Sequence, residues 1–166
     1  RRYHDHEYGY PIAEDDRLFE RLVFEINQAG LSWTTILNKA DNLRRAYDHF
    51  AIERVAAYGE ADIARLLADA GIIRNRRKIA AAIHNARVIR ELQAAHGSFR
   101  AWLDAQVGAD KATWVKLFKK TFAFTGPEIT GEFLMSSGYL EGAHRRDCPV
   151  YTQILAAHPR WLTGGG

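Results

Sequence analysis

Cysteine is nearly absent from this chain of 166 residues, because Cys148 is the only one. A single cysteine excludes an internal disulfide framework and suits a reducing compartment, so we expect a cytoplasmic protein. No apolar run in the sequence approaches the roughly 20 residues that a membrane-spanning helix needs, and no secretory signal is visible. We therefore expect neither a disulfide-stapled secreted domain nor a membrane partner.

Neither sign of charge is in large excess, since 23 Lys and Arg residues face 20 Asp and Glu residues. The net charge of +3 and the pI near 9.1 permit a nucleic-acid partner but do not demand one. Hydrophobic residues make up 47% of the chain and charged residues 26%, which is typical of a folded domain. A chain of this length buries about 70% of its unfolded surface, so it can fold without a metal or a disulfide.

Apolar residues recur at helical spacing along most of the chain, and no alternating strand pattern of useful length occurs. Residues 16–29 form the clearest amphipathic segment, with Asp15 as its predicted N-cap and Gly30 as its predicted end. Pro127 suits the first turn of a helix. The sequence therefore predicts an all-α fold, with further helices over 33–39, 42–50, 60–69, 74–95, 99–106, 111–120 and 127–137, and a last helix after Pro149.

A carboxylate lies close to the apolar face of the first predicted helix. Glu25 follows Leu22 by three residues and directly precedes Ile26. Burying a carboxylate costs free energy unless something pairs with it. Trp33 follows a Gly-Leu-Ser turn that could bring its ring near Glu25, and a carboxylate beside an indole face suits a flat cation. The alternative is a boundary glutamate paired with an arginine and a tryptophan that packs in the core.

A glycine turn separates the two predicted helices 111–120 and 127–137. The segment Phe122-Ala123-Phe124-Thr125-Gly126-Pro127 follows the basic pair Lys119 and Lys120. Backbone N–H groups at the start of a helix can hold a phosphate, and lysines beside them add affinity for DNA. The alternative is an ordinary connection between two helices.

Both ends of the chain carry possible metal ligands. His144 and Cys148 are four residues apart and can meet on one helical turn, but two ligands make only half of a structural zinc site. His4 would have to join them from the other end of the chain. It belongs to a stretch, residues 3–11, that is rich in tyrosine, histidine and carboxylates. The alternative is a solvated arm whose tyrosines pack on the core.

Taken together, these segments resemble the type I 3-methyladenine DNA glycosylases of the helix-hairpin-helix superfamily. The similar stretches occur in the family's order from Tyr3 to about Tyr151: YHDHEYG (3–9), LFERLVFEINQAGLSW (18–33), DAGIIRNRRKI (69–79), FAFTGP (122–127), FLMSSG (133–138) and H-x-x-x-C (144–148). The resemblance implies a single helical domain over 1–166, with a helix-hairpin-helix element at about 114–137. It also implies a pocket between two lobes, one built from both chain ends and the other from about 40–140.

The resemblance assigns roles to the pocket residues. Glu25 matches the catalytic carboxylate that hydrogen-bonds the methylated base, and Trp33 matches the aromatic ring that stacks on it. Tyr3 matches a second wall of the pocket, and Tyr8 stands where the family usually has tryptophan. We therefore expect a site that selects a flat cationic base.

The resemblance also implies the DNA and zinc contacts. Gln28, Gly30 and Leu31 match the loop that approaches the lesion, and Leu31 is the candidate to fill the gap left by a flipped base. Gly126 matches the glycine that contacts a DNA phosphate, with Lys119 and Lys120 beside it. Three of the family's four zinc ligands have counterparts, and the fourth, a cysteine upstream of the YHD stretch, has none among these residues. The three counterparts are His4, His144 and Cys148.

The implied function is base-excision repair in a bacterial cytoplasm, by a monomeric, monofunctional enzyme. It would hydrolyse the N-glycosidic bond of alkylated purines in double-stranded DNA, chiefly 3-methyladenine, and release the free base. Three alternatives stay open at this point. They are a helical DNA-binding module without catalysis, a zinc-stapled protein that binds another flat cation, and a glycosylase with a broader range of alkylated purines.

Overall fold

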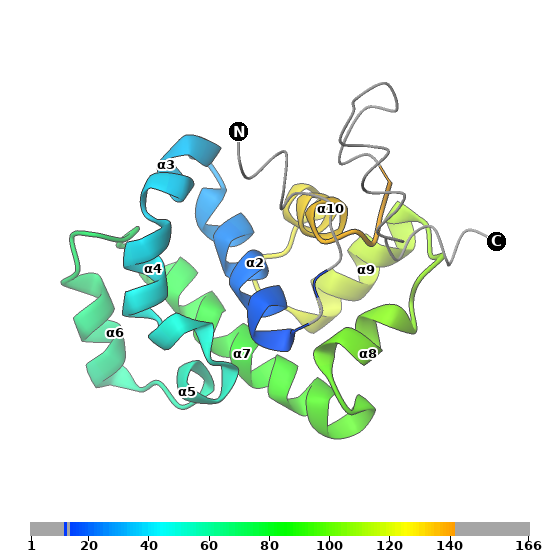
Figure 1. The fold of residues 1–166 in the computed structure, drawn as a ribbon, viewed down its shortest axis with the longest axis horizontal. Coiled ribbons are helices and arrows are strands. Elements are labelled where there is room, and N and C mark those ends of the chain that lie inside the picture. Colours follow the sequence, from blue (N-terminus) through cyan, green and yellow to red (C-terminus); the bar gives the residue numbers. More distant parts are fainter. Residues whose placement is uncertain (1–11, 13, 142–166) are drawn as a thin grey trace.

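The computed structural model describes residue 12 and residues 14–141 (Figure 1). Every regular element in those ranges is a helix, which confirms the predicted all-α fold. No helix in this part of the chain is long and apolar enough to span a membrane. In chain order, the elements are α2 (Asp15–Gln28), α3 (Trp33–Asn38), α4 (Ala40–Ala46), the 3-10 turn η1 (Asp48–Phe50), α5 (Ile52–Ala56), α6 (Glu60–Leu67), α7 (Arg76–His96), α8 (Phe99–Asp104), α9 (Lys111–Thr121) and α10 (Pro127–Ser136).

The core is organised around α2 and α7. Figure 1 shows α3 to α6 on one side of α2 and α8 to α10 on the other, and the long helix α7 runs diagonally from the first group to the second. The apolar face predicted for α2 is fully inside, because Leu18, Phe19 and Leu22 have no exposed surface. One hydrophobic cluster extends from Leu18 to Tyr139. Burial of that cluster is the main stabilising contribution to the fold.

Aromatic rings fill the half of the core beneath α8, α9 and α10. The ring centroids of Phe118 and Phe122 lie 5.1 Å apart, and those of Phe118 and Phe133 lie 5.7 Å apart. Trp102 packs edge-on against Phe122 at 5.9 Å. Such pairs add to the free energy gained from burial alone. The connection between α9 and α10 therefore packs against a cluster of closely spaced aromatic rings.

The prediction that Asp15 is the N-cap of α2 was wrong. Asp15 is the first residue of the helix, and Glu14 at the cap position makes no side-chain cap bond. The carboxylate of Asp15 instead accepts hydrogen bonds from the backbone N–H groups of Phe99 at 2.9 Å and Arg100 at 3.0 Å. A carboxylate at the N-terminus of another helix is favoured by the helix dipole. Asp15 therefore ties the start of α2 to the start of α8.

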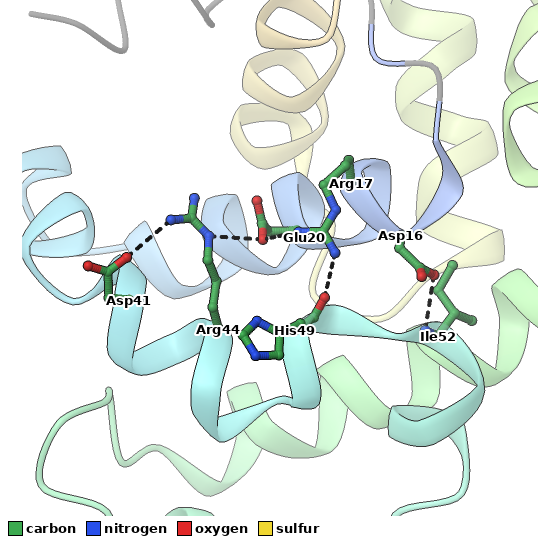
Figure 2. A network of polar contacts seen from close by, with 7 residues as sticks. All are labelled: Asp16, Arg17, Glu20, Asp41, Arg44, His49 and Ile52. Atoms are coloured by element: carbon green, nitrogen blue, oxygen red, sulfur yellow. Dashed lines mark hydrogen bonds and ion pairs between the residues drawn. The ribbon is translucent and has the colours of Figure 1, made fainter.

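The helix predicted over 42–50 ends early, and α5 was not predicted. Asp48, His49 and Phe50 have φ angles of 52°, 55° and 57°. This left-handed backbone is unfavourable for residues other than glycine. Side chains of α2 hold the bend in place (Figure 2), because Arg17 donates to the carbonyl of His49 and Asp16 accepts from the N–H of Ile52 at 3.1 Å. Contacts between segments override the helical pattern here.

The other helices agree with the sequence pattern to within a few residues at each end. The helix predicted after Pro149 and the expected closeness of the two chain ends lie outside the described residues. The division into two lobes stays a prediction for the same reason, because one lobe was assigned to the chain ends.

Candidate active site

A cavity of about 1060 Å³ opens between the C-terminal end of α2, the α2–α3 loop (residues 29–32) and α10. Glu25, Gln28, Gly30 and Trp33 line one side of it, and Gly126 lines the other. These five residues were all singled out from the sequence, and the structure brings them to one place. Leu31 and the basic pair Lys119 and Lys120 do not line this cavity.

Glu25 is a buried carboxylic acid that faces the cavity. Its exposed fraction is 2%, and its Oε1 atom accepts no hydrogen bond from the described residues. Burial raises the pKa of Glu25 from an ordinary 4.5 to about 8, the positive charge of Arg21 acts to lower it, and the negative charge of Glu132 acts to raise it further. A pKa of about 8 leaves Glu25 largely protonated at neutral pH. A cation in the cavity would favour the ionised carboxylate.

Trp33 belongs both to the core and to the cavity. It is the first residue of α3, where the side chain of Ser32 accepts a cap hydrogen bond from the N–H of Thr35 at 3.2 Å. The indole is partly buried against the hydrophobic cluster and also lines the cavity. The two readings of this residue, core tryptophan and pocket wall, are therefore compatible. The cap fixes where α3 begins, and with it the backbone position of Trp33.

The α2–α3 loop is a tight turn that presents an apolar side chain. The N–H of Leu31 donates to the carbonyl of Gln28 at 2.7 Å, and Nε2 of Gln28 donates to the carbonyl of Leu31 at 2.9 Å. Gly30 has a φ of +81°, which glycine adopts without strain. Leu31 is 38% exposed and is the one large hydrophobic side chain among the described residues that faces solvent. An exposed leucine on a constrained loop suits insertion between bases.

The α9–α10 turn (residues 122–126) leads to Gly126, which caps α10, and Pro127 begins the helix. The φ of Gly126 is −69°, so the backbone does not require glycine there, and a Cβ would meet nothing within 4 Å. Gly126 lines the cavity that contains Glu25. A second cavity of about 510 Å³ adjoins it and is lined by Arg77, Lys119, Phe124 and Gly126. Lys120 is exposed and lines neither cavity.

The structure adds cavity residues that were not singled out from the sequence. Glu128 and Glu132 line the wall formed by α10, and Lys111 reaches the cavity from the start of α9. Its side chain lies against Gly131, where a Cβ would come within 3.4 Å of Nζ. The four-residue spacing of the two glutamates was visible in the sequence, but a solvated helix face shows the same spacing.

The family model for methyladenine glycosylases matches residues 1–151. The chain belongs to the methyladenine glycosylase family. DNA-3-methyladenine glycosylase 1 of Escherichia coli (strain K12) is 34% identical over 168 residues, which cover 90% of this chain and 89% of that relative. A DNA-3-methyladenine glycosylase of Haemophilus influenzae (strain ATCC 51907 / DSM 11121 / KW20 / Rd) is 30% identical over 169 residues, with 90% and 91% covered.

Solved structures of the family have the same fold. A variant of 3-methyladenine DNA glycosylase I in complex with 3-methyladenine superimposes with a TM-score of 0.82 at 32% identity, covering 90% of each chain. The 3-methyladenine DNA glycosylase I of Staphylococcus aureus gives a TM-score of 0.82 at 32% identity, covering 90% of this chain and 89% of that one. The all-α architecture is therefore that of the methyladenine glycosylases.

Several residues that the family resemblance singled out lie outside the described part of the chain. Among residue 12 and residues 14–141, no group of three or more histidine, cysteine or acidic side chains could hold a metal ion. The expected zinc ligands and the two pocket tyrosines stay predictions. These residues are His4, His144, Cys148, Tyr3 and Tyr8.

Proposed function

We propose that this member of the methyladenine glycosylase family hydrolyses the N-glycosidic bond of alkylated purines in DNA, chiefly 3-methyladenine. The main support for this function is that Glu25 and Trp33 line the same cavity. Glu25 is a buried carboxylic acid, and its Oε1 atom has no hydrogen-bond partner among the described residues. A carboxylate beside an aromatic face is complementary to a flat cation. An adenine methylated at N3 is such a cation while it is bonded to the sugar.

The reaction requires little acid catalysis by the protein. Methylation at N3 places a positive charge on the base and weakens its bond to the sugar, so the leaving group needs no proton. The enzyme must first extrude the nucleotide from the duplex, which costs a few kcal/mol and least at a damaged pair. Water then attacks C1′ of the sugar as the C1′–N9 bond breaks. The products are the neutral free base, an abasic site in the DNA, and the proton that the attacking water releases to solvent.

Glu25 and Trp33 divide the recognition of the base between them. The ionised form of Glu25 favours the cationic base over neutral adenine because the charges are opposite. Trp33 supplies a stacking face that is worth about 1–3 kcal/mol per base. Tyr3 and Tyr8 are proposed as further pocket walls on the family resemblance alone.

The DNA is proposed to lie across the α2–α3 loop and the α9–α10 turn. Leu31, with Gln28 and Gly30, would occupy the space of the extruded base. The open side of Gly126 would accept a phosphate, and Lys119 and Lys120 would add attraction that does not depend on sequence. Replacing both lysines by alanine should weaken binding to all sequences alike and reduce the salt dependence of binding. An altered sequence preference would contradict this surface.

A structural zinc site is proposed on His4, His144 and Cys148, completed by a fourth ligand. Zinc of this kind contributes to folding. The His144→Ala variant should therefore lose thermal stability more than it loses activity per folded molecule. Metal analysis of the purified protein decides the question, because a protein without stoichiometric zinc would refute the site.

The function is tested by base release from duplexes that carry defined alkyl lesions. The protein should release 3-methyladenine fastest, and Glu25→Gln should lose discrimination between 3-methyladenine and adenine while remaining folded. Glu128→Gln is the matched control, because Glu128 lines the same cavity but is exposed. Binding without base release would favour a non-catalytic DNA-binding module. Equal release of several alkylated purines would favour a broader range.

A further inference from the structure

We propose that Lys78 and Asn85 on α7 are positioning residues, which hold the α2–α3 loop and the α9–α10 turn at a fixed separation across the cavity. The two residues are seven positions apart, so they lie on one face of the helix, about 10.5 Å apart along its axis. The inference rests on the proposed function for its effect on catalysis. The contacts themselves are independent of it.

Lys78 is bound to the end of α2. It is 6% exposed, and its Nζ donates to the carbonyls of Asn27 at 3.0 Å and Ala29 at 2.9 Å. The last carbonyls of a helix have no partner within the helix, and an ammonium group there is favoured by the helix dipole. Burial disfavours the charged ammonium group. The two hydrogen bonds to the start of the loop offset that cost, and an apolar side chain of the same length would not make them.

Asn85 is bound to the α9–α10 turn in the same way. It has no exposed surface, its Nδ2 donates to the carbonyl of Ala123 at 3.0 Å, and its Oδ1 accepts from the N–H of Ala123 at 2.7 Å. The next residue, Phe124, has a φ of +65°, a backbone conformation that is sterically unfavourable for residues other than glycine. The paired hydrogen bonds at Ala123 hold the turn in this conformation. Gly126 follows two residues later.

Both held segments face the cavity that contains Glu25. Gln28, Ala29 and Gly30 line one side, and Gly126 and Pro127 line the other. In the proposed reaction the base must reach Glu25 while a phosphate rests at the turn, so the distance between the two segments sets the geometry of the bound nucleotide. A displacement of about 1 Å can lower a rate by as much as 100-fold.

The two residues should differ in the step they affect. Lys78→Met should lower kcat for release of 3-methyladenine by about 10- to 100-fold while changing Kd for undamaged duplex less than about twofold. Asn85→Leu should instead weaken binding to any duplex by about tenfold and leave the binding of free 3-methyladenine unchanged. Lys78→Arg keeps the donors and should restore most of kcat.

Arg87 provides a matched control on the same helix. Its guanidinium donates to the carbonyls of Ala56 at 2.8 Å and Tyr58 at 2.9 Å, so it makes the same kind of contact away from the cavity. Arg87→Met should lower thermal stability without changing kcat, Kd or free-base binding per folded molecule. Asn85→Ala removes both hydrogen bonds to Ala123 with a smaller side chain, and it serves if Asn85→Leu does not fold.

Amide hydrogen exchange measures how firmly each segment is held, and the measurement does not depend on catalytic activity. Lys78→Met should speed exchange at the N–H of Leu31, and the Asn85 variant should speed it at the N–H of Ala123, each with little change at the other position. The proposal is overturned if both variants lose function only in proportion to unfolding, as Arg87→Met would, or if Lys78→Arg is as impaired as Lys78→Met. A wild-type protein that releases no base would refute the proposed function instead, and the exchange pattern would still decide the positioning roles.

Discussion

The carboxylate of Asp15 accepts a 2.9 Å hydrogen bond from the backbone N–H of Phe99, 84 residues further along the chain. Asp15 also accepts from Arg100 and from the side chain of Gln93. A hydrogen bond to a charged group contributes about 1.5–3 kcal/mol. Asp15→Ala should therefore lower the free energy of unfolding by about 2–3 kcal/mol in urea denaturation. Asp41→Ala is the control, because the Asp41 side chain is 87% exposed, and it should change stability by less than about 0.5 kcal/mol.

The stability of the protein should depend on pH through Glu25. The folded protein keeps this proton up to a pKa of about 8, whereas the unfolded chain releases it above the ordinary value of 4.5. Folding therefore takes up a proton between these two pKa values, and stability falls as pH rises through that window. The Glu25→Gln variant has no proton to lose. Its free energy of unfolding relative to wild type should therefore increase with pH by on the order of 1.4 kcal/mol per pH unit, a few kcal/mol over the window. Urea denaturation measures the free energy of unfolding of both proteins from pH 5 to pH 8. A constant difference between the two over that range would contradict the assignment.

Binding of a cationic base should release a proton. Glu25 is protonated below its pKa of about 8, and a bound cation favours the ionised form. Affinity for a permanently charged probe, adenine methylated at both N3 and N9, should therefore rise about tenfold per pH unit below that pKa. Calorimetry in buffers of different ionisation enthalpy measures the released proton. Glu25→Gln should bind the probe with no such pH dependence.

Trp33 should contribute affinity for flat bases whether or not they are charged. Trp33→Ala should weaken binding of both the permanently charged probe, adenine methylated at N3 and N9, and neutral adenine by about 1–3 kcal/mol, because stacking needs only a π face. Trp33→Phe keeps a smaller face and should lose less. Equilibrium binding of the two free bases measures the effect. A loss confined to the charged base would show that Trp33 acts through charge and not through stacking.

Leu31 should matter only where a base must be extruded. Leu31→Ala removes an exposed side chain, so the free energy of unfolding should change by less than about 0.5 kcal/mol. Excision from a fully paired duplex should slow, while excision from single-stranded DNA should not, because no partner base has to be displaced there. Equal slowing on both substrates would place Leu31 in the chemical step instead. Single-turnover rates on the two substrates separate these cases.

The sequence was most informative where a local pattern decides the structure. The apolar period of α2 placed Leu18, Phe19 and Leu22 in the core, and the same helix put Glu25 at its inner edge. The Gly-Leu-Ser turn then set Trp33 beside that carboxylate. These residues are neighbours in the chain, so the geometry of α2 and one short turn nearly fixes their arrangement.

The sequence was least informative where partners come from distant segments. The left-handed turn at His49 has no glycine to mark it, and it is held by Arg17 from α2. Lys78 and Asn85 have ordinary helical positions, and only the folded chain shows which carbonyl groups they reach. The cavity wall on α10 was missed because Glu128 and Glu132 have the spacing of a solvated face.

The connection of α7 to two separate loops limits where this chain can change in length. One residue inserted between Lys78 and Asn85 would turn Asn85 by about 100° around the helix axis and move it about 1.5 Å along it. Its amide would then leave Ala123, whichever residue was inserted. An insertion between Gly97 and Gly108 would leave both contacts in register. Related chains should therefore vary in length after α7 and keep a constant number of residues within it.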